Sequence, residues 1–166
     1  MKLFFGFLSV VLVGGVKIAY RNYKKGDSCD DPIFKAVCPK KQGIPCYVAV
    51  NLDVKRNNVL GYIIMDIPAR LSHEEEAAVR SKMSNPKKPG GFGYIKNVEV
   101  SEAFRGQGIG TRLIKYSIKL GIEAGNIVAT TLLVDAENQD AIRLYKRLGF
   151  IEVIHDISDI FMAFYL

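Results

Sequence analysis

Histidine and cysteine are both scarce in this chain. The two histidines are His73 and His155, and the three cysteines, Cys29, Cys38 and Cys46, form no CxxC pair. A structural zinc site needs ligands in closer pairs, so no metal site is expected. Because the cysteine count is odd, the sequence also argues against a disulfide framework, and it predicts free, partly buried thiols in a reducing compartment.

The chain lacks a concentrated basic patch. Its 23 basic and 17 acidic residues give a formal charge of +6, and the basic residues are spread out without interleaved aromatics. This distribution disfavours nucleic acid as a partner. A small polyanionic ligand or an acidic macromolecule remains compatible with the moderate positive balance.

Internal repeats, low-complexity tracts and breaks in composition are also absent. The chain has 166 residues, of which 49% are hydrophobic. This length and composition fit one domain with a buried core.

An uncharged apolar run occupies residues 3–16, between Lys2 and Lys17. It is similar to the core of a signal peptide, but it is short for a membrane-spanning helix, which needs about 20 residues. Three alternatives stay open: a targeting or anchoring segment, a buried first strand with an extension, or a start upstream of the true domain. The lack of any Asn-x-Ser/Thr sequon disfavours secretion. We therefore divide the chain into an extension, residues 1–16, and a domain, residues 17–166.

Hydrophobic patterning predicts alternating strands and helices over the rest of the chain. Ser72 with Glu75 has the spacing of a capping box, and Asn138 and Gly149 suit the two ends of a helix. A short helix or irregular segment is expected near Pro32. Strands are expected at 16–24, 46–54, 59–67, 94–100 and 127–136 and in a final hairpin, and helices at 71–83, 111–125 and 138–148.

Three glycines follow an arginine where the predicted strand ends and the next helix begins, in Arg105-Gly106-Gln107-Gly108-Ile109-Gly110. The exposed N–H groups and the dipole of a helix N-terminus favour an anion. Gly108 and Gly110 would let the backbone approach phosphate oxygens, Arg105 would add charge, and Thr111 would bond a phosphate or cap the helix. The G-x-G-x-G spacing departs from the dinucleotide fingerprint, and no lysine follows as in a nucleotide P-loop. The segment therefore predicts phosphate binding, but not of NAD or ATP.

Two motifs carry a family resemblance. "VEVSEAFRGQGIGTRLI" resembles the acyl-CoA-binding motif, R/Q-x-x-G-x-G/A, of the GNAT superfamily of N-acetyltransferases. "NQDAIRLYKRLGF" resembles a second motif of that family, through Asn138, Ala141, Leu144, Tyr145, Gly149 and Phe150. The resemblance covers about residues 90–155. It implies an α/β GNAT fold, with a mixed central sheet of six to seven strands, a splayed parallel pair and about four flanking helices.

The resemblance also implies acetyl transfer from acetyl-CoA, as co-substrate, to a primary amine of a small molecule or a protein. Tyr145 would be the general acid for the CoA thiolate, or would only touch the coenzyme. Asn138 would bond the coenzyme or cap its helix. Glu99 is the candidate general base, with His155 and a water-relayed base as alternatives. The coenzyme would be held by residues 105–110, by Thr111 and, along its pantetheine arm, by the backbone near Val98 and Val100.

The acceptor stays open at this stage. The turn between His155 and Ile160 is short, and the long turn associated with protein N-terminal acetylation is missing. A small amine or a lysine side chain fits this feature. The alternative function is a non-catalytic acyl-CoA sensor or partner-binding module. We expect a cytoplasmic monomer or homodimer, or a membrane-associated protein that is tethered through residues 3–16 and faces the cytosol.

Overall fold

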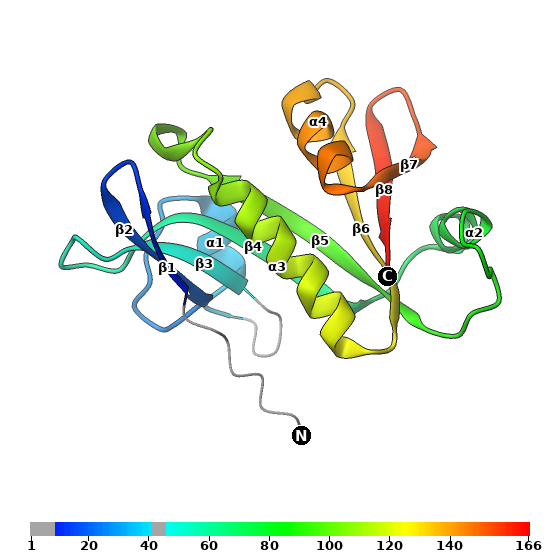
Figure 1. Cartoon of the computed structure of the whole chain (residues 1–166), viewed down its shortest axis with the longest axis horizontal. Helices are drawn as coiled ribbons and strands as arrows, with labels where there is room; N and C mark the ends of the chain where they lie inside the picture. Colours follow the sequence, from blue (N-terminus) through cyan, green and yellow to red (C-terminus); the bar gives the residue numbers. More distant parts are fainter. Residues whose placement is uncertain (1–8, 41–45) are drawn as a thin grey trace. The chain divides into compact units, whose positions relative to one another are not determined.

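An eight-stranded mixed sheet forms the centre of the fold in the computed structural model, which describes residues 9–40 and 46–166 (Figure 1). The strand order is β1-β2-β3-β4-β5-β6-β8-β7, and β5 and β6 run parallel. The α/β class and the parallel pair are confirmed, whereas the predicted number of six to seven strands is wrong. The strands are β1 (Ser9–Val13), β2 (Val16–Asn22), β3 (Cys46–Asn51), β4 (Asn58–Ala69), β5 (Gly91–Val100), β6 (Ile127–Asp135), β7 (Ile151–His155) and β8 (Asp159–Tyr165). The helices are α1 (Pro32–Val37), α2 (His73–Ser81), α3 (Ile109–Ala124) and α4 (Gln139–Leu148).

The additional strand is β1, which lies in the apolar run near the N-terminus. It forms an antiparallel hairpin with β2, closed where Val13 faces Val16. The turn residues Gly14 and Gly15 have φ angles of 55° and 82°. Two central residues with positive φ are what a two-residue hairpin turn requires, and glycine adopts them without steric cost. Residues 9–13 therefore form a strand, but none of its side chains is fully buried and Leu12 is 70% exposed, while residues 1–8 lie outside the described residues.

Within the described part of the chain, no helix is long and apolar enough to cross a membrane. The division of the chain at residue 16 stays a prediction.

The fold divides into two compact units. Unit 1 comprises Met1–Ile64 and Asn97–Ile114, and unit 2 comprises Met65–Lys96 and Lys115–Leu166. Each unit has its own hydrophobic cluster, so each is described by itself.

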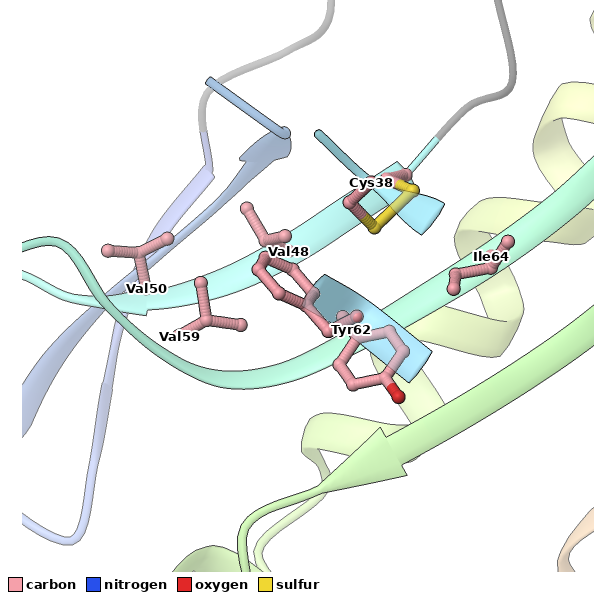
Figure 2. Packing of buried hydrophobic residues seen from close by; sticks show 8 residues of the cluster. Cys38, Val48, Val50, Val59, Tyr62 and Ile64 are labelled. Carbon is pink, nitrogen blue, oxygen red and sulfur yellow. A yellow bond between two sulfur atoms is a disulfide. The ribbon is translucent and has the colours of Figure 1, made fainter. Parts of the chain in front are cut away.

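In unit 1, the short helix α1 packs on β3 and β4. The Phe34 ring lies edge-on to Tyr62, with the ring centroids 5.2 Å apart. The helix begins where the Asp31 carboxylate accepts the N–H groups of Ile33 and Phe34, at 2.8 and 3.0 Å, and Pro32 occupies the first turn. Figure 2 shows the surrounding cluster, whose buried members are Phe34, Cys38, Cys46, Val48, Val50, Val59, Tyr62 and Ile64.

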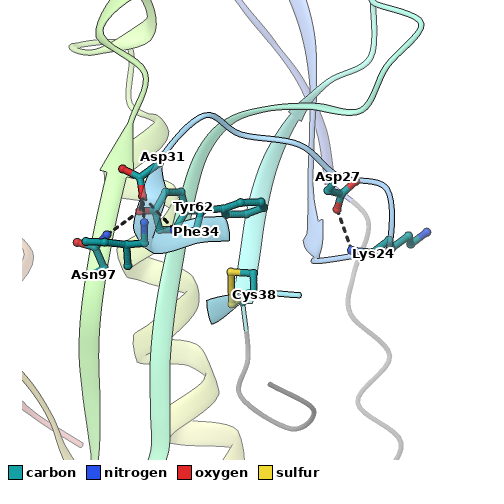
Figure 3. Close-up of a disulfide and its surroundings, with 9 residues drawn as sticks. Lys24, Asp27, Asp31, Phe34, Cys38, Tyr62 and Asn97 are labelled. Carbon is teal, nitrogen blue, oxygen red and sulfur yellow. Dashed lines mark hydrogen bonds between the residues drawn. A yellow bond between two sulfur atoms is a disulfide. The ribbon is translucent and has the colours of Figure 1, made fainter. Parts of the chain in front are cut away.

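A disulfide joins Cys38 to Cys46 in this cluster (Figure 3). The expectation of free thiols is therefore wrong for these two residues, whereas Cys29 is free. Cys38 directly follows α1 and Cys46 opens β3, so the ends of two elements packed in one core place their Cα atoms 5.8 Å apart. This separation lies within the range that a disulfide bridges.

We expect reduction of the disulfide to lower the free energy of unfolding. The cysteines are eight residues apart, and closing so short a loop stabilises a fold by about 2–3 kcal/mol in the chain-entropy model. Urea unfolding should therefore show a lower midpoint in dithiothreitol, and the same fall for Cys38→Ala with Cys46→Ala in non-reducing buffer. Cys29→Ala is the control, because it should leave the reductant-dependent difference unchanged. Equal midpoints with and without reductant would contradict the expectation.

In unit 2, helix caps follow the chemistry that the sequence predicts. Ser72 and Glu75 form the capping box at the start of α2, and the Asn138 side chain accepts the Ala141 N–H at the start of α4. Gly149 ends α4 with a φ of 102°, in the left-handed region. One buried cluster of this unit comprises Val79, Phe92, Val128, Ala129, Phe161 and Ala163.

Parallel pairing of β5 with β6 runs from Gly91 opposite Ile127 to Ile95 opposite Leu132. Strand β5 then continues to Val100, where the glycine segment follows. The expected divergence of the two strands beyond this register stays a prediction.

Candidate coenzyme site

The glycine segment lies in unit 1, between the end of β5 and the start of α3. Gly106 and Gly108 have φ angles of 72° and 85°, which L side chains rarely adopt. Among the described residues, no atom beyond the glycine and its chain neighbours lies within 4 Å of a Cβ placed at either position. Gly110 is helical instead, and a Cβ there would meet Val100 at an ordinary 3.7 Å. The backbone conformation therefore requires glycine at 106 and 108. The sequence predicts instead that Gly108 and Gly110 are the glycines the loop needs.

The loop presents a continuous run of backbone donors. Arg112 N–H donates to the Gly108 carbonyl at 3.1 Å, which closes the first turn of α3 on Gly108. Across residues 9–40 and 46–166, no acceptor bonds the N–H groups from Gly106 to Thr111. Because buried or ligand-facing N–H groups need partners and a helix N-terminus carries partial positive charge, this run suits an anion.

Arg105 is tied to the end of β5. Its Nη2 donates to Glu99 Oε1 at 2.8 Å, and its Nε donates to the Val100 carbonyl at 3.0 Å. Both side chains of this ion pair remain partly exposed. The structure therefore brings together two residues predicted for different roles, a phosphate ligand and a general base.

A second arginine of this region was not predicted as a site residue. Arg112 lies in the first turn of α3, which contains no acidic residue. Its Nη1 donates to Ser9 Oγ at 3.0 Å, and its guanidinium lies 5.0 Å from the centre of the Tyr20 ring. A cation in the first turn opposes the helix dipole, and a bound anion would relieve this conflict. The sequence feature that could have indicated Arg112 as an anion ligand is a first helical turn that contains a cation but no acidic residue.

The other candidate residues lie in unit 2. The Tyr145 ring packs edge-on against Phe150, with centroids 5.7 Å apart. Burial raises the pKa of the Tyr145 phenol above its ordinary value. Its hydroxyl makes no hydrogen bond to any residue that the structure describes. Asn138 is confirmed as the N-cap of α4, with Oδ1 3.2 Å from the Ala141 nitrogen. Its contact with a coenzyme stays a prediction.

The last hairpin also belongs to unit 2. His155, the alternative base, is exposed, and its Nδ1 lies 3.2 Å from the Glu152 carboxylate. Between β7 and β8 only Asp156, Ile157 and Ser158 intervene, so the turn is as short as the sequence predicts.

Unit 1 also contains a series of linked side-chain hydrogen bonds that the sequence does not predict. Asn97 Nδ2 donates to the Tyr62 hydroxyl, which donates to Asp31 Oδ1, and both distances are 2.7 Å (Figure 3). It joins β5, β4 and the N-cap of α1. Burial disfavours ionised Asp31, but hydrogen bonds from Tyr62, Phe34 and Ile33 outweigh it, so the pKa of this carboxyl lies below its ordinary value. The local signal was Asp31-Pro32, a common start of a helix.

A lowered carboxyl pKa makes stability depend on pH. The stabilisation is present above the unfolded-state pKa and is lost as pH falls through the folded-state value. We expect Asp31→Ala to lower the free energy of unfolding by about 1–2 kcal/mol near pH 7. The difference from wild type should shrink below about pH 4. Urea unfolding across this range measures it, and Asp30→Ala is the control, because Asp30 is exposed and bonds only the exposed Lys35. A pH-independent difference would contradict the assignment.

Residues 17–150 match the model of the acetyltransferase (GNAT) family. The chain belongs to this family. The match covers the glycine segment, α3, β6 and α4, and so includes both motifs found in the sequence.

Named relatives are similar to part of the chain. The N-alpha-acetyltransferase of Sulfurisphaera tokodaii is 43% identical over 61 residues, which are 37% of this chain and 36% of that protein. The spermidine N(1)-acetyltransferase of Escherichia coli K12 is 37% identical over 51 residues, 31% of this chain and 27% of that protein. The matched parts thus span between about a quarter and just over a third of these relatives.

Solved structures share the fold over nearly the whole chain. NAA60 of Arabidopsis thaliana in complex with acetyl-CoA aligns with a TM-score of 0.68 and 20% identity, covering 90% of this chain and 98% of that chain. The same protein with a bisubstrate analogue gives a TM-score of 0.70 at 20% identity, covering 90% and 99%. At this identity the likeness establishes the fold.

Proposed function

We propose that the protein is an acetyltransferase that transfers the acetyl group of acetyl-CoA to a primary amine. The observation that carries the proposal is the run of N–H groups from Gly106 to Thr111, which bond no acceptor among the described residues, in a chain that belongs to the GNAT family. A neighbour of the same fold, NAA60, was solved with acetyl-CoA, which supports this choice of anion.

The residues of unit 1 fit the phosphate end of this coenzyme. The N–H groups bind the pyrophosphate, and the left-handed Gly106 and Gly108 keep them aimed outward. Arg105 adds positive charge beside them while Glu99 orients it. The backbone near Val98 and Val100 pairs with the pantetheine arm, as the family resemblance implies.

Acetyl-CoA supplies an activated thioester, and the chain's side chains manage the protons. Glu99 takes a proton from the amine, whose nitrogen then forms the new bond to the acetyl carbon as the carbon–sulfur bond breaks. Tyr145 is protonated at neutral pH, as an ordinary phenol is, and burial raises its pKa further; it donates this proton to the departing thiolate.

Turnover distinguishes this proposal from a non-catalytic acyl-CoA sensor. We would incubate the protein with acetyl-CoA and a panel of amines, and detect acetylated products by mass spectrometry. The panel comprises spermidine, a peptide with a free α-amine, and an N-terminally blocked peptide containing lysine. An acetylated acceptor together with released CoA supports the enzyme, while tight coenzyme binding without any product would favour the sensor.

The acceptor is proposed to be a small amine or a lysine side chain. The relatives act by name on both N-terminal amines and spermidine. The short turn between β7 and β8 supports a small amine or a lysine side chain, rather than a protein N-terminus, as the acceptor. We also propose that the catalytic domain faces the cytosol, where acetyl-CoA is available.

A further inference from the structure

An exposed apolar and basic surface lies at one end of β1, β2 and β3, outside the coenzyme site. It is called here the Leu12 face. Leu12 is opposite Lys17 in the hairpin register, and the Leu52 N–H donates to the Lys17 carbonyl at 2.8 Å, so the three residues form a row across three strands. The Leu12 face comprises Val10, Leu12, Lys17, Leu52, Val54, Lys55 and Arg56.

The apolar side chains of this face are exposed to solvent in the described structure. Leu12 is 70% exposed and Val10 is 50% exposed, while Leu52 and Val54 are nearly half exposed. Residues directly opposite in antiparallel strands point to the same side of a sheet. Val10 is opposite Ala19 and Ala19 is opposite Val50, which is buried in the cluster beneath α1. Val10 and Leu12 therefore continue an apolar side of the sheet beyond the part that is buried.

Basic residues neighbour these apolar side chains, since Lys17 is opposite Leu12, and Lys55 and Arg56 follow Val54 in the loop after β3. Lys17, Lys55 and Arg56 are exposed, and the nearby acid, Asp53, accepts the Lys17 backbone N–H at 2.8 Å. None of the three basic side chains has an ion-pair partner among the described residues. Apolar side chains fringed by unpaired cations complement a bilayer with anionic headgroups.

We propose that the Leu12 face docks on the surface of an anionic lipid bilayer. An acidic protein could satisfy the cations, but the exposed leucine and valine side chains on an edge strand and a turn match the apolar boundary of a bilayer better. The proposal does not rest on acetyl transfer.

Vesicle cosedimentation of the full chain tests this proposal. The vesicles are phosphatidylcholine alone, and phosphatidylcholine with phosphatidylserine in equal parts. We expect binding to the anionic vesicles, weakened by salt. Lys55→Gln with Arg56→Gln should lower the partition coefficient roughly 30-fold, because each basic residue near such a surface contributes on the order of a kilocalorie per mole. Leu12→Thr with Leu52→Thr should lower it roughly tenfold or more while keeping strand propensity.

Matched variants separate this surface from general charge and apolarity. Lys87→Gln with Lys88→Gln removes two exposed cations elsewhere, and Ile122→Thr with Ile157→Thr removes exposed isoleucines. Both should bind as wild type does, and circular dichroism checks that all variants fold. The proposal is overturned if wild type ignores anionic vesicles, or if the Leu12-face variants bind as well as the controls do. It is likewise overturned if light scattering shows a dimer that Leu12→Thr dissociates while vesicles go unbound, because the face would then pair two copies of the chain.

Discussion

Replacing Gly108 with valine is expected to weaken the binding of acetyl-CoA roughly 100-fold or more. Gly108 has a φ of 85°, and its carbonyl accepts the first hydrogen bond of α3. A β-branched residue resists this conformation, so the backbone must rotate and turn the N–H run away from the phosphates. Losing two charge-assisted hydrogen bonds of about 1.5–3 kcal/mol each weakens binding roughly 100-fold or more. Isothermal titration calorimetry measures this change.

The control for Gly108→Val is Gly125→Val. Gly125 has a φ of 72°, and a Cβ there also meets no atom within 4 Å, but it follows α3 rather than preceding it. Both variants therefore carry similar backbone strain, and only the first should lose the coenzyme. If a folded Gly108→Val variant bound acetyl-CoA as tightly as wild type does, the N–H run would not be what holds the pyrophosphate.

A thermal-shift measurement tests acetyl-CoA binding by these variants independently of calorimetry. Ligand at about 100 times its dissociation constant stabilises a fold by about 2.7 kcal/mol. For a domain of this size that corresponds to a rise of about 5–11 °C in the melting temperature. Wild type and Gly125→Val should show the rise, and Gly108→Val should not.

Features set by local chemistry could be predicted from the sequence. The helix caps depend only on neighbouring residues. The structure confirms the capping box of Ser72 and Glu75, the N-cap Asn138 and the left-handed C-cap Gly149. The glycine segment was readable for the same reason, because a strand end, a helix start and left-handed residues are all encoded within one short stretch.

Features that depend on distant parts of the chain could not be predicted in this way. Pairing of Cys38 with Cys46 requires α1 and β3 to pack in one core, which no spacing rule contains. The Arg112 contact with Ser9 joins residues 103 positions apart, through a strand that the sequence offered only as one of three alternatives. The Asn97–Tyr62–Asp31 chain is likewise invisible until three elements meet. Glu99 shows the limit at the site itself, since its ion pair with Arg105 was not foreseen.

Tyr145→Phe is expected to lower kcat roughly 10²–10⁴-fold, the range typical of a lost general acid. Burial raises the phenol pKa above its ordinary value of about 10, so the proton is held throughout the neutral range. Raising the pH from about 7 to about 9 should therefore not remove the acid in wild type. The affinity for acetyl-CoA should change little, because the substitution keeps the ring and its contact with Phe150. Steady-state kinetics and calorimetry on the same preparation separate the two effects.

Tyr165→Phe is the matched control for the lost hydroxyl. The Tyr165 hydroxyl donates to the Val79 carbonyl at 2.7 Å, so its removal should lower the free energy of unfolding by about 1 kcal/mol and leave kcat unchanged. Tyr145→Phe should behave in the opposite way, because its hydroxyl bonds no described residue and contributes little to the fold. If kcat survived in Tyr145→Phe while stability fell, the phenol would be a structural group, and the thiolate would have to take its proton from solvent.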